Sequence, residues 1–341
     1  MQAVILAGGS GTRLRPLTSR VAKPVVTLVN RPFIVYMLDW LRRHGCTDVI
    51  LCCGFQAEGV QAVLGDGSAH GVSLRYVAES EPLGTGGPLL LARELLGERF
   101  VVCNGDILTD IDLGAQLAAH ERSGAAVTLA LVSVEDASAY GMVRCAPDSA
   151  VLEFVEKPSG PPPTNVLISA GVYVLERSVL ELIAPGRQVS IEREVWPALI
   201  GAGLYGHVAE GYWLDIGTPE RYLQGSFDII TGAVNVDGPA PRERAAIGVG
   251  CEIAADARIG ELVVLGDGVQ VGAGASIERS VVLAGAQIGA GAVLRDSIVG
   301  ERAKIGPNVE LQEGVVVGED AQIAAKALIA AGTRVAAGEC M

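Results

Sequence analysis

The chain of 341 residues lacks any apolar run near the roughly 20 residues that span a bilayer, and no basic segment precedes the apolar residues at its N-terminus. Its seven cysteines contain no CxxC pair. These absences argue against a membrane helix, a secretory signal, a zinc framework and a disulfide framework. We therefore expect a cytoplasmic protein with reduced thiols and no membrane partner.

Positive charge is scarce, since 26 Lys and Arg residues stand against 39 Asp and Glu residues and give a net charge of −13. Such a chain repels nucleic acid and anionic lipid, so we expect neither as a partner. Residues 1–31 depart from this balance, because they contain no acidic residue and carry Arg13, Arg15, Arg20, Lys23 and Arg31. This local excess of positive charge predicts that the segment receives an anion.

Aromatic residues make up only 4% of the chain, and none follows Phe227, so the last 114 residues contain no Phe, Tyr or Trp. A composition shift this sharp marks a domain boundary, and a chain of this length suits two domains. We predict a first domain over residues 1–231, a linker over 232–246 and a second domain over 247–341.

The second domain is built from six-residue repeats. Aliphatic residues recur at this spacing, with two slips of one residue, at Ile247, Ile253, Ile259, Leu265, Val271, Ile277, Leu283, Ile288, Leu294, Val299, Ile305, Leu311, Val317, Ile323, Ile329 and Val335. This spacing predicts a parallel β-helix of about five coils, in which each aliphatic side chain stacks on its equivalent one coil away. Ordinary strands with one buried face would show a period of two instead.

The first domain alternates between two kinds of segment. Apolar runs predict strands over Ala3–Leu6, Asp48–Cys53, Phe100–Cys103 and Val127–Val134. Helical spacing predicts helices over Pro32–His44, Gly87–Leu96 and Leu113–Ser123. This alternation predicts an α/β fold with a mostly parallel sheet and helices on both faces. Ligands of such sheets bind where the strands end, which directs attention to the residues that follow each strand.

A glycine-rich loop follows the first strand, with the sequence Leu6-Ala7-Gly8-Gly9-Ser10-Gly11-Thr12-Arg13. Successive glycines let backbone N–H groups converge on a phosphate. A dinucleotide-binding loop would need glycine at Leu14, and the GxxxxGK[ST] pattern of a P-loop is absent. The loop therefore predicts a phosphate site of a third design.

Two lysines and two aspartates are further candidates. The chain has four lysines, and the two in the first domain, Lys23 and Lys157, each precede a proline. A compact ammonium group at a stiff X-Pro step suits a phosphate ligand. Asp106 follows a predicted strand and Asp215 interrupts an apolar stretch. Either aspartate alone is typical of a turn or cap, but together they can hold one Mg²⁺ ion through oxygen ligands.

Several segments, taken in order, resemble those of the sugar-1-phosphate nucleotidyltransferases, also called nucleotide-sugar pyrophosphorylases. They are LAGGSGTRLRPL with the later KP, residues 81–89 (EPLGTGGPL), 104–106 (NGD), 140–143 (YGMV), 155–158 (VEKP) and 213–217 (WLDIG). The resemblance covers the whole chain and is closest to the mannose-1-phosphate guanylyltransferase branch. It implies a Rossmann-like, mostly parallel sheet followed by a left-handed β-helix of hexapeptide repeats.

The resemblance also implies an activity: Mg²⁺-dependent transfer of a nucleotidyl group from an NTP, expected to be GTP, to a sugar 1-phosphate, expected to be mannose 1-phosphate. Pyrophosphate leaves, and no covalent intermediate is needed. We further expect a homo-oligomer, with the repeats as an assembly or regulatory surface.

By the same resemblance, residues of this sequence acquire expected roles. The catalytic residues are Arg13, Lys23 and Lys157. The nucleotide contacts are Leu6, Ala7, Gly8, Gly9, Gly11, Thr12, Arg13, Lys23, Leu83, Gly84 and Thr85. The sugar-phosphate contacts are Asn104, Gly141, Glu156, Lys157, Ser169 and Gly171. The metal ligands are Asp106 and Asp215.

Alternatives remain open at this point. Ser169 stands where the family commonly has Asn, so the acceptor could be a heptose or cyclitol 1-phosphate. Thymidylyl or uridylyl transfer to glucose 1-phosphate, or a regulatory subunit that binds nucleotide sugar without turnover, are further candidates. A hexapeptide acyltransferase usually needs a catalytic His. All four histidines precede the repeats, which argues against that activity.

Overall fold

The computed structural model describes residues 1–54, 56–158, 160, 166–238 and 245–341. By its internal contacts the chain divides into two compact units. The first comprises Met1–Gly9 and Met37–Trp213, and the second comprises Ser10–Tyr36 and Leu214–Met341. Part of the predicted linker, residues 239–244, lies outside the described residues. The domain boundaries at 231 and 247 stay a prediction, and the division by contacts follows a different line along the chain.

A nine-stranded sheet forms the centre of the first unit, in the order β10-β9-β11-β6-β1-β4-β5, with β8 joining β11 and β12 at one side. Its parallel part consists of β6 (Arg99–Asn104), β1 (Gln2–Ala7), β4 (Asp48–Cys53) and β5 (Ser73–Ala78). The other strands are β8 (Val127–Val134), β9 (Gly141–Cys145), β10 (Val151–Glu156), β11 (Val166–Glu176) and β12 (Leu204–Val208). The Rossmann-like fold class is confirmed, with β11 entering antiparallel to β6.

Helices border this sheet. They are α1 (Phe33–Arg43), α2 (Ala57–Leu64), α3 (Gly87–Leu91), α4 (Leu113–Ser123) and α5 (Trp196–Leu199). Tighter 3₁₀ turns lie at Ser68–His70, Arg93–Leu95 and Arg177–Leu182, and a wider π-helical turn at Ile191–Val195 leads into α5. The predicted helix over Gly87–Leu96 ends early, because the chain tightens into a 3₁₀ turn that buries Leu96 in the core of the sheet. Helix α4 matches its prediction, since Asp112 accepts a hydrogen bond from Ala115 N at 3.0 Å and Gly124 ends the helix.

The second unit contains short elements of the N-terminal segment and one long helix besides the repeats. They are the 3₁₀ turns Thr12–Leu14 and Lys23–Val25, the strands β2 (Thr27–Leu28) and β3 (Arg31–Pro32), and α6 (Pro219–Thr231). Two further short strands lie at the predicted metal ligands. Strand β7 (Ile107–Thr109) belongs to the first unit and directly follows Asp106, and β13 (Trp213–Asp215), which ends with Asp215, begins in the first unit and ends in the second. The hydroxyl of Tyr222 on α6 donates to the Thr27 carbonyl oxygen at 2.5 Å, which ties the helix to the N-terminal segment.

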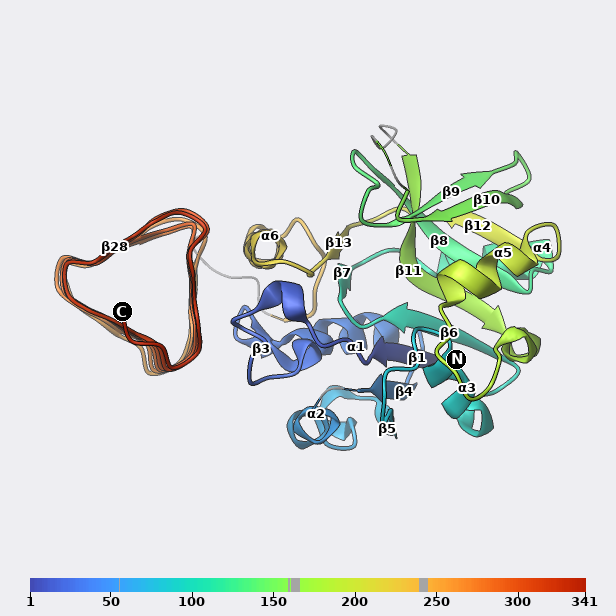
Figure 1. The fold of residues 1–341 in the computed structure, drawn as a ribbon, viewed down its shortest axis with the longest axis horizontal. Coiled ribbons are helices and arrows are strands. Elements are labelled where there is room, and N and C mark those ends of the chain that lie inside the picture. Colours follow the sequence, from blue (N-terminus) through green and yellow to red (C-terminus); the bar gives the residue numbers. More distant parts are fainter. Residues whose placement is uncertain (55, 159, 161–165, 239–244) are drawn as a thin grey trace. The chain divides into compact units, whose positions relative to one another are not determined.

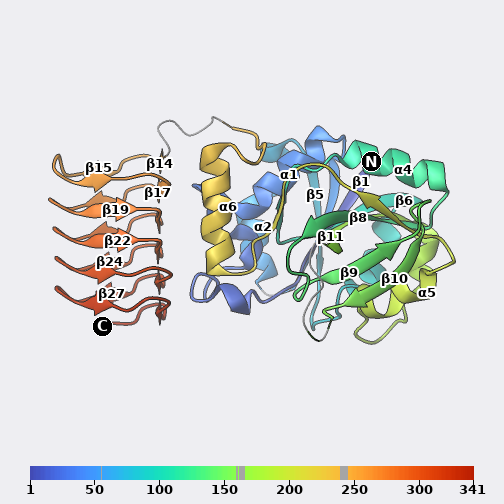
Figure 2. The same ribbon diagram turned by 90° about the horizontal axis from the view of Figure 1, so that it is seen from above.

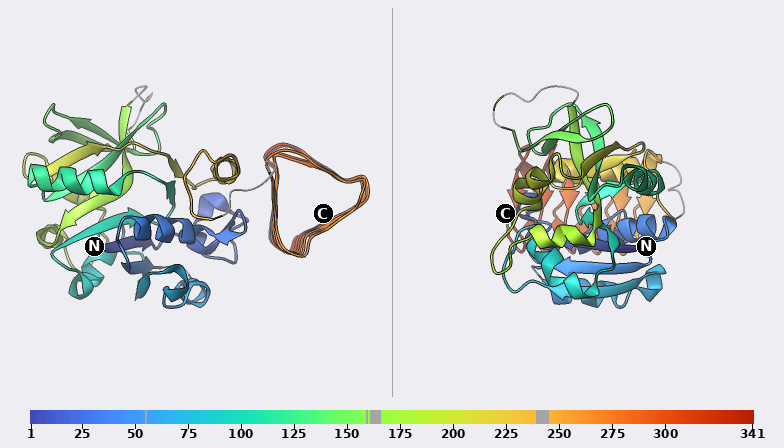
Figure 3. Two further views of the ribbon diagram at one scale, coloured as in Figure 1. Left: turned by 180° about the vertical axis from the view of Figure 1, so that it is seen from behind. Right: turned by 90° about the vertical axis from the view of Figure 1, so that its right-hand side faces the viewer.

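The repeats form a parallel β-helix, seen along its axis as a triangle in Figures 1 and 3 and from the side in Figure 2. Its strands make three parallel sheets of six, five and five strands. They are β14 (Ala245–Ile247), β15 (Glu252–Ile253), β16 (Arg258–Ile259), β17 (Val263–Leu265), β18 (Gln270–Val271), β19 (Ser276–Glu278), β20 (Val281–Val282), β21 (Gln287–Ile288), β22 (Val293–Arg295), β23 (Ile298–Val299), β24 (Lys304–Ile305), β25 (Glu310–Leu311), β26 (Val316–Val317), β27 (Gln322–Ile323), β28 (Leu328–Ile329) and β29 (Arg334–Val335).

One predicted repeat position is wrong. Leu265 pairs with Val282, and Val282 pairs with Val299, so Val282 takes the stacked position that we expected for Leu283. The first five-residue interval therefore falls between Ile277 and Val282, one repeat earlier than the sequence indicated. Both residues are buried aliphatics, and only the hydrogen-bonded register of the coils distinguishes them.

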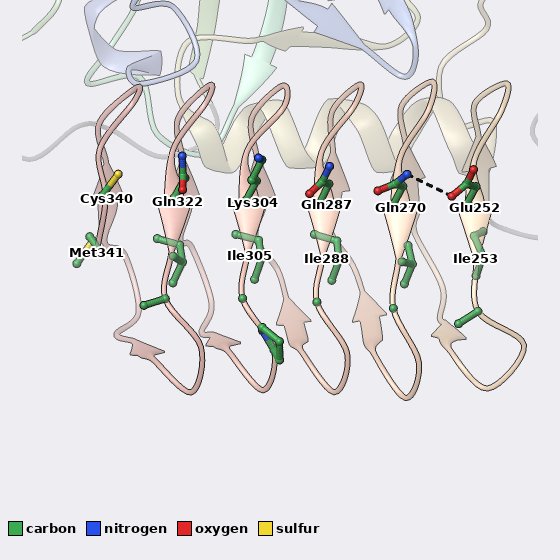
Figure 4. Close-up of a pocket in the computed structure, with 18 residues that line it drawn as sticks. Glu252, Ile253, Gln270, Gln287, Ile288, Lys304, Ile305, Gln322, Cys340 and Met341 are labelled. Carbon is green, nitrogen blue, oxygen red and sulfur yellow. Dashed lines mark hydrogen bonds between the residues drawn. The ribbon is translucent and has the colours of Figure 1, made fainter.

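Figure 4 shows how residues alternate on one sheet of the β-helix. On the sheet β15-β18-β21-β24-β27, polar side chains point outward from each coil, and the aliphatic residue after each points inward. The outward row is Glu252, Gln270, Gln287, Lys304 and Gln322, which borders a shallow groove of about 900 Å³. Gln270 Nε2 donates to Glu252 Oε2 at 3.2 Å along this row. Each coil therefore contributes one inward and one outward residue to each sheet.

Within the residues that the structure describes, no helix is both long and apolar enough to cross a membrane.

Candidate active site

The predicted site residues fall in both compact units. The first unit holds Leu6, Ala7, Gly8, Gly9, Leu83, Gly84, Thr85, Asn104, Asp106, Gly141, Glu156, Lys157, Ser169 and Gly171. The second holds Gly11, Thr12, Arg13, Lys23 and Asp215.

The end of β1 in the first unit meets a half-buried carboxyl group, that of Glu79. A Cβ atom added at Gly8 would lie 2.5 Å from Glu79 Oε1, so any side chain there would displace Glu79. Glu79 directly follows β5, and its Oε2 accepts a hydrogen bond from Leu83 N at 3.0 Å. Burial raises the pKa of Glu79, and the hydrogen bond from Leu83 opposes that rise. The Glu79 carboxyl group thus lies against the start of the glycine-rich loop and accepts a hydrogen bond from the segment 83–85.

Sequence reasoning missed Glu79. The strand before it, β5, reads Ser-Leu-Arg-Tyr-Val-Ala and lacks the continuous apolar run that marked β1 and β4. The signal that could have found it was an acidic residue directly after a strand of the parallel sheet, at the edge where ligands bind.

Backbone hydrogen bonds with Val189 hold the segment Leu83–Thr85 in place. Val189 N donates to the Leu83 carbonyl oxygen at 3.0 Å, and Gly86 N donates to the Val189 carbonyl oxygen at 2.9 Å. Gly84 has a φ of 77°, and an added Cβ would lie 2.3 Å from that same oxygen. Only glycine allows this approach, so the pairing fixes the shape of the segment.

Several predicted sugar-side residues gather around one buried phenol, Tyr173. Burial is the main reason that its pKa is raised, and the charges of Glu192 and Glu156 raise it further. Hydrogen bonds with Ser169 and Asn104 act in the opposite direction. The Ser169 hydroxyl lies 3.4 Å from the Tyr173 hydroxyl oxygen. The fold therefore brings together residues that lie far apart in the sequence.

Because Gly171 has no side chain, the backbone of β11 can lie close to the Asn104 side chain. Its φ is 72°, and a Cβ atom there would lie 2.7 Å from Asn104 Nδ2. The register of β11 against β8 shifts between Ser169 and Tyr173, so the strand is irregular at this point. Trp213 Nε1 donates to the Ala170 carbonyl oxygen at 2.7 Å, which supports the irregular backbone.

Gly141 and Glu156 face each other across the β9–β10 pair. A Cβ atom at Gly141 would lie 2.5 Å from Phe154 Cζ and 3.1 Å from Glu156 Oε2. Burial, followed by the charge of Glu192, raises the pKa of Glu156. Lys157 follows with a φ of 51° and places its Nζ atom 3.8 Å from Glu156 Oε1. The structure thus places side by side two residues to which the resemblance assigns sugar-phosphate contacts, and those roles stay a prediction.

The second unit brings its own predicted residues together. A Cβ atom at Gly11 would lie 3.2 Å from Lys23 Cβ, so Lys23 packs against the loop. Arg13 Nη2 lies 3.8 Å from Asp215 Oδ2, and the side chains of Arg13 and Asp215 keep 60% and 12% of their surface exposed. Asp215 thus directs an accessible guanidinium group.

Family models match both parts of the chain. The model described as Nucleotidyl transferase matches residues 2–232, and the model described as GMPPB C-terminal domain matches residues 242–337. The chain belongs to the nucleotidyl transferase family. It is therefore an enzyme that transfers nucleotidyl groups.

Individual relatives of this nucleotidyltransferase agree. A mannose-1-phosphate guanylyltransferase of Mycobacterium tuberculosis is 39% identical over 84% of this chain and 80% of its own length. Mannose-1-phosphate guanylyltransferase 1 of Arabidopsis thaliana is 36% identical over 84% of this chain and 82% of its own. The crystal structure of HddC from Yersinia pseudotuberculosis complexed with GMP-PN is 28% identical, with a TM-score of 0.58, over 66% of this chain and 97% of that one.

Nucleotidyltransferases of this kind generally use a divalent metal ion, and the candidate ligands of this chain have suitable chemistry. Asp106 and Asp215 offer carboxylate oxygens, the donors that hard divalent cations prefer. Gly105 N donates to the Leu6 carbonyl oxygen at 2.8 Å, which holds Asp106 next to the end of β1. In the described part of the chain no group of three or more His, Cys, Asp or Glu side chains could hold a metal ion. Substrate phosphates and water would have to complete its coordination.

The close approach at Gly171 gives a prediction for this nucleotidyltransferase. Gly171→Ala introduces a Cβ atom at positive φ and against Asn104, so it should lower the free energy of unfolding by about 1 kcal/mol and reduce turnover about tenfold or more because Asn104 must move. Gly124→Ala is the control, since Gly124 also has positive φ (61°) but open space around it. It should lose similar stability and keep its activity. Urea unfolding and pyrophosphate release measure the two effects; equal turnover by both variants would contradict the role of Asn104.

Proposed function

We propose that the chain transfers a guanylyl group from GTP to mannose 1-phosphate, with Mg²⁺ as its metal ion, and forms GDP-mannose and pyrophosphate. The observation that carries this proposal is the similarity to curated mannose-1-phosphate guanylyltransferases over 84% of the chain, a share that extends into the repeats. The reaction exchanges one P–O bond for another, so catalysis needs positioned substrates and neutralised phosphate charge rather than a covalent intermediate.

Glu79 supports guanine as the base. Guanine presents two donors side by side, its ring N1–H and its 2-amino group, and a carboxylate can accept from both. Glu79 lies between the glycine-rich loop and the segment 83–85, the two segments that the sequence predicted as nucleotide contacts. The similarity to HddC, which was crystallised with GMP-PN, also supports a guanine nucleotide.

The charged residues take these proposed roles. Backbone N–H groups of the loop Gly8–Arg13 bind the triphosphate, and Arg13 and Lys23 stabilise the leaving pyrophosphate. Lys157 holds the phosphate of the sugar while one of its oxygens attacks the α-phosphorus. Asp106 and Asp215 would hold Mg²⁺, which supplies positive charge to the phosphate oxygens when bound.

The sugar is proposed to lie against Asn104, Gly141, Glu156, Ser169 and Gly171, around Tyr173. Glu156 accepts hydrogen bonds from sugar hydroxyls, and Gly141 leaves room beside it. Because Ser169 turns its hydroxyl toward Tyr173, it reaches less far than the Asn of many family members. A heptose or cyclitol 1-phosphate is therefore the second candidate acceptor.

We also propose that the enzyme acts in the cytoplasm as a homo-oligomer. Its acidic composition and reduced thiols support the first statement. The exposed polar row of the sheet β15-β18-β21-β24-β27, shown in Figure 4, supports the second.

A substrate matrix tests the proposed reaction. Pyrophosphate release is measured for GTP, ATP, UTP, CTP and dTTP against mannose, glucose and heptose 1-phosphates. We expect the highest kcat/KM for GTP with mannose 1-phosphate. A clear preference for dTTP or UTP with glucose 1-phosphate would overturn the proposal, and so would binding of nucleotide sugar without any turnover.

Glu79→Gln tests the base contact. The amide keeps only one acceptor, so kcat/KM for GTP should fall about 10- to 100-fold, while the preference for GTP over ITP, which lacks the 2-amino group, should shrink. Glu81→Gln is the matched control, because Glu81 lies in the same segment and is exposed. An unchanged GTP-to-ITP ratio in Glu79→Gln would show that Glu79 does not read the base.

Asp106→Asn tests the metal ligand. The amide is isosteric but neutral, so the variant should fold normally and lose about 100- to 1,000-fold in Mg²⁺-dependent turnover. Asp148→Asn, an exposed turn residue, should behave like the wild type. Circular dichroism checks the fold and a Mg²⁺ titration of pyrophosphate release checks the role. Turnover at the wild-type level would exclude Asp106 from metal binding.

A further inference from the structure

The loop that carries Arg13 ends in two carbonyl groups that point away from its own turn. The 3₁₀ turn Thr12–Leu14 is closed by Leu14 N donating to Gly11 O and by Arg15 N donating to Thr12 O. The carbonyl oxygens of Arg13 and Arg15 instead accept from a single donor, Nη1 of Arg334, at 2.9 and 3.1 Å. A cation at the C-terminal end of a helical turn is favourable, because the carbonyl dipoles there are negative.

Arg334 belongs to β29 in the last coil of the β-helix, more than 300 residues further along the chain. The contact lies inside the second compact unit, which contains both the N-terminal segment 10–36 and the repeats. The planar guanidinium group can serve two acceptors at once, and its geometry is rigid. The last coil therefore holds the loop on both sides of Leu14.

Two further contacts bind the same N-terminal segment to other coils. Arg20 Nη1 lies 2.7 Å from Asp320 Oδ2, and Asp320 is itself held by Arg302 Nε at 2.9 Å. Asn30 Nδ2 donates to the Leu265 carbonyl oxygen at 2.9 Å. The repeats thus contact the segment at three places, and Arg334 is the contact nearest to Arg13.

We propose that Arg334 is a positioning residue of the nucleotidyl transfer: the last coil of the β-helix holds the phosphate-binding loop in the conformation from which Arg13 acts. The inference rests on the proposed role of Arg13 at the triphosphate. The hydrogen bonds of Arg334 go to backbone carbonyl groups of the loop, and its charge also lowers the pKa of Glu220 on α6. In this proposal Arg334 sets the direction of Arg13 without contacting substrate. The repeats then contribute to turnover as well as to assembly.

The experiment compares Arg334→Gln, Arg334→Lys and a matched control, Arg258→Gln, in the full chain. Arg258 takes the same repeat position as Arg334, directly before the inward aliphatic residue of β16, and is exposed. Arg334→Gln should speed amide hydrogen exchange in residues 11–19 about five- to tenfold and lower kcat by a similar factor, with the KM for the sugar phosphate unchanged. Arg334→Lys should recover most of both, and Arg258→Gln should match the wild type.

Three outcomes would overturn the proposal: exchange in residues 11–19 that is unchanged in Arg334→Gln, faster exchange with unchanged kcat, or equal effects in Arg258→Gln. If Arg334→Gln lowers the melting temperature, Arg334→Lys distinguishes lost positioning of the loop from unfolding of the β-helix. The shorter cation of lysine can replace the contact with the loop, but it would not restore a β-helix that has unfolded. The exchange comparison needs no substrate. It therefore still tests the contact if GTP and mannose 1-phosphate prove to be the wrong pair.

Discussion

Backbone segments in this protein approach each other more closely than a Cβ atom permits, and the candidate site depends on those approaches. Gly84 lies against the Val189 carbonyl group, Gly105 against that of Leu6, and Gly171 against the Asn104 side chain, where an added Cβ would come within 2.3, 2.8 and 2.7 Å. Each approach fixes one segment of the predicted site: the nucleotide segment, the turn that carries Asp106 and the sugar-side strand. Glycine is needed at these points for contact rather than for flexibility.

Charge is the second constraint. A chain with a net charge of −13 has to bind two phosphate-bearing substrates, and the cations that we predict for this task are concentrated locally. Arg13 and Lys23 lie on one loop, and Asp215 directs Arg13 without neutralising the exposed side of the guanidinium group. On the sugar side Lys157 lies beside Glu156, whose own pKa is raised by burial and by Glu192. The carboxylates near the predicted phosphates thus orient cations or offer oxygen to a metal ion.

The sequence predicted whole elements well where the signal is local. Strand β4 and helix α4 have the predicted bounds, because a continuous apolar run and a capped helix depend on neighbouring residues only. The predictions from sequence failed where contacts between residues that lie far apart in the chain determine the structure. The helix α3 ends early to bury Leu96, and Val282 rather than Leu283 joins the stacked column. Glu79 could not be singled out, because one acidic residue after a strand that lacks a continuous apolar run has no distinctive spacing.

By itself the sequence determined the two architectures, the family and the residue types at the site, because repeat period, strand–helix alternation and glycine spacing are properties of the chain read in order. The tertiary structure decided which of those residues meet. Asn104, Glu156 and Ser169 come from three strands and interact with Tyr173. Arg334 donates hydrogen bonds to the carbonyl groups of Arg13 and Arg15. Such meetings depend on the pairing of strands and coils that lie far apart in the chain, and no local pattern records a hydrogen bond across 321 residues.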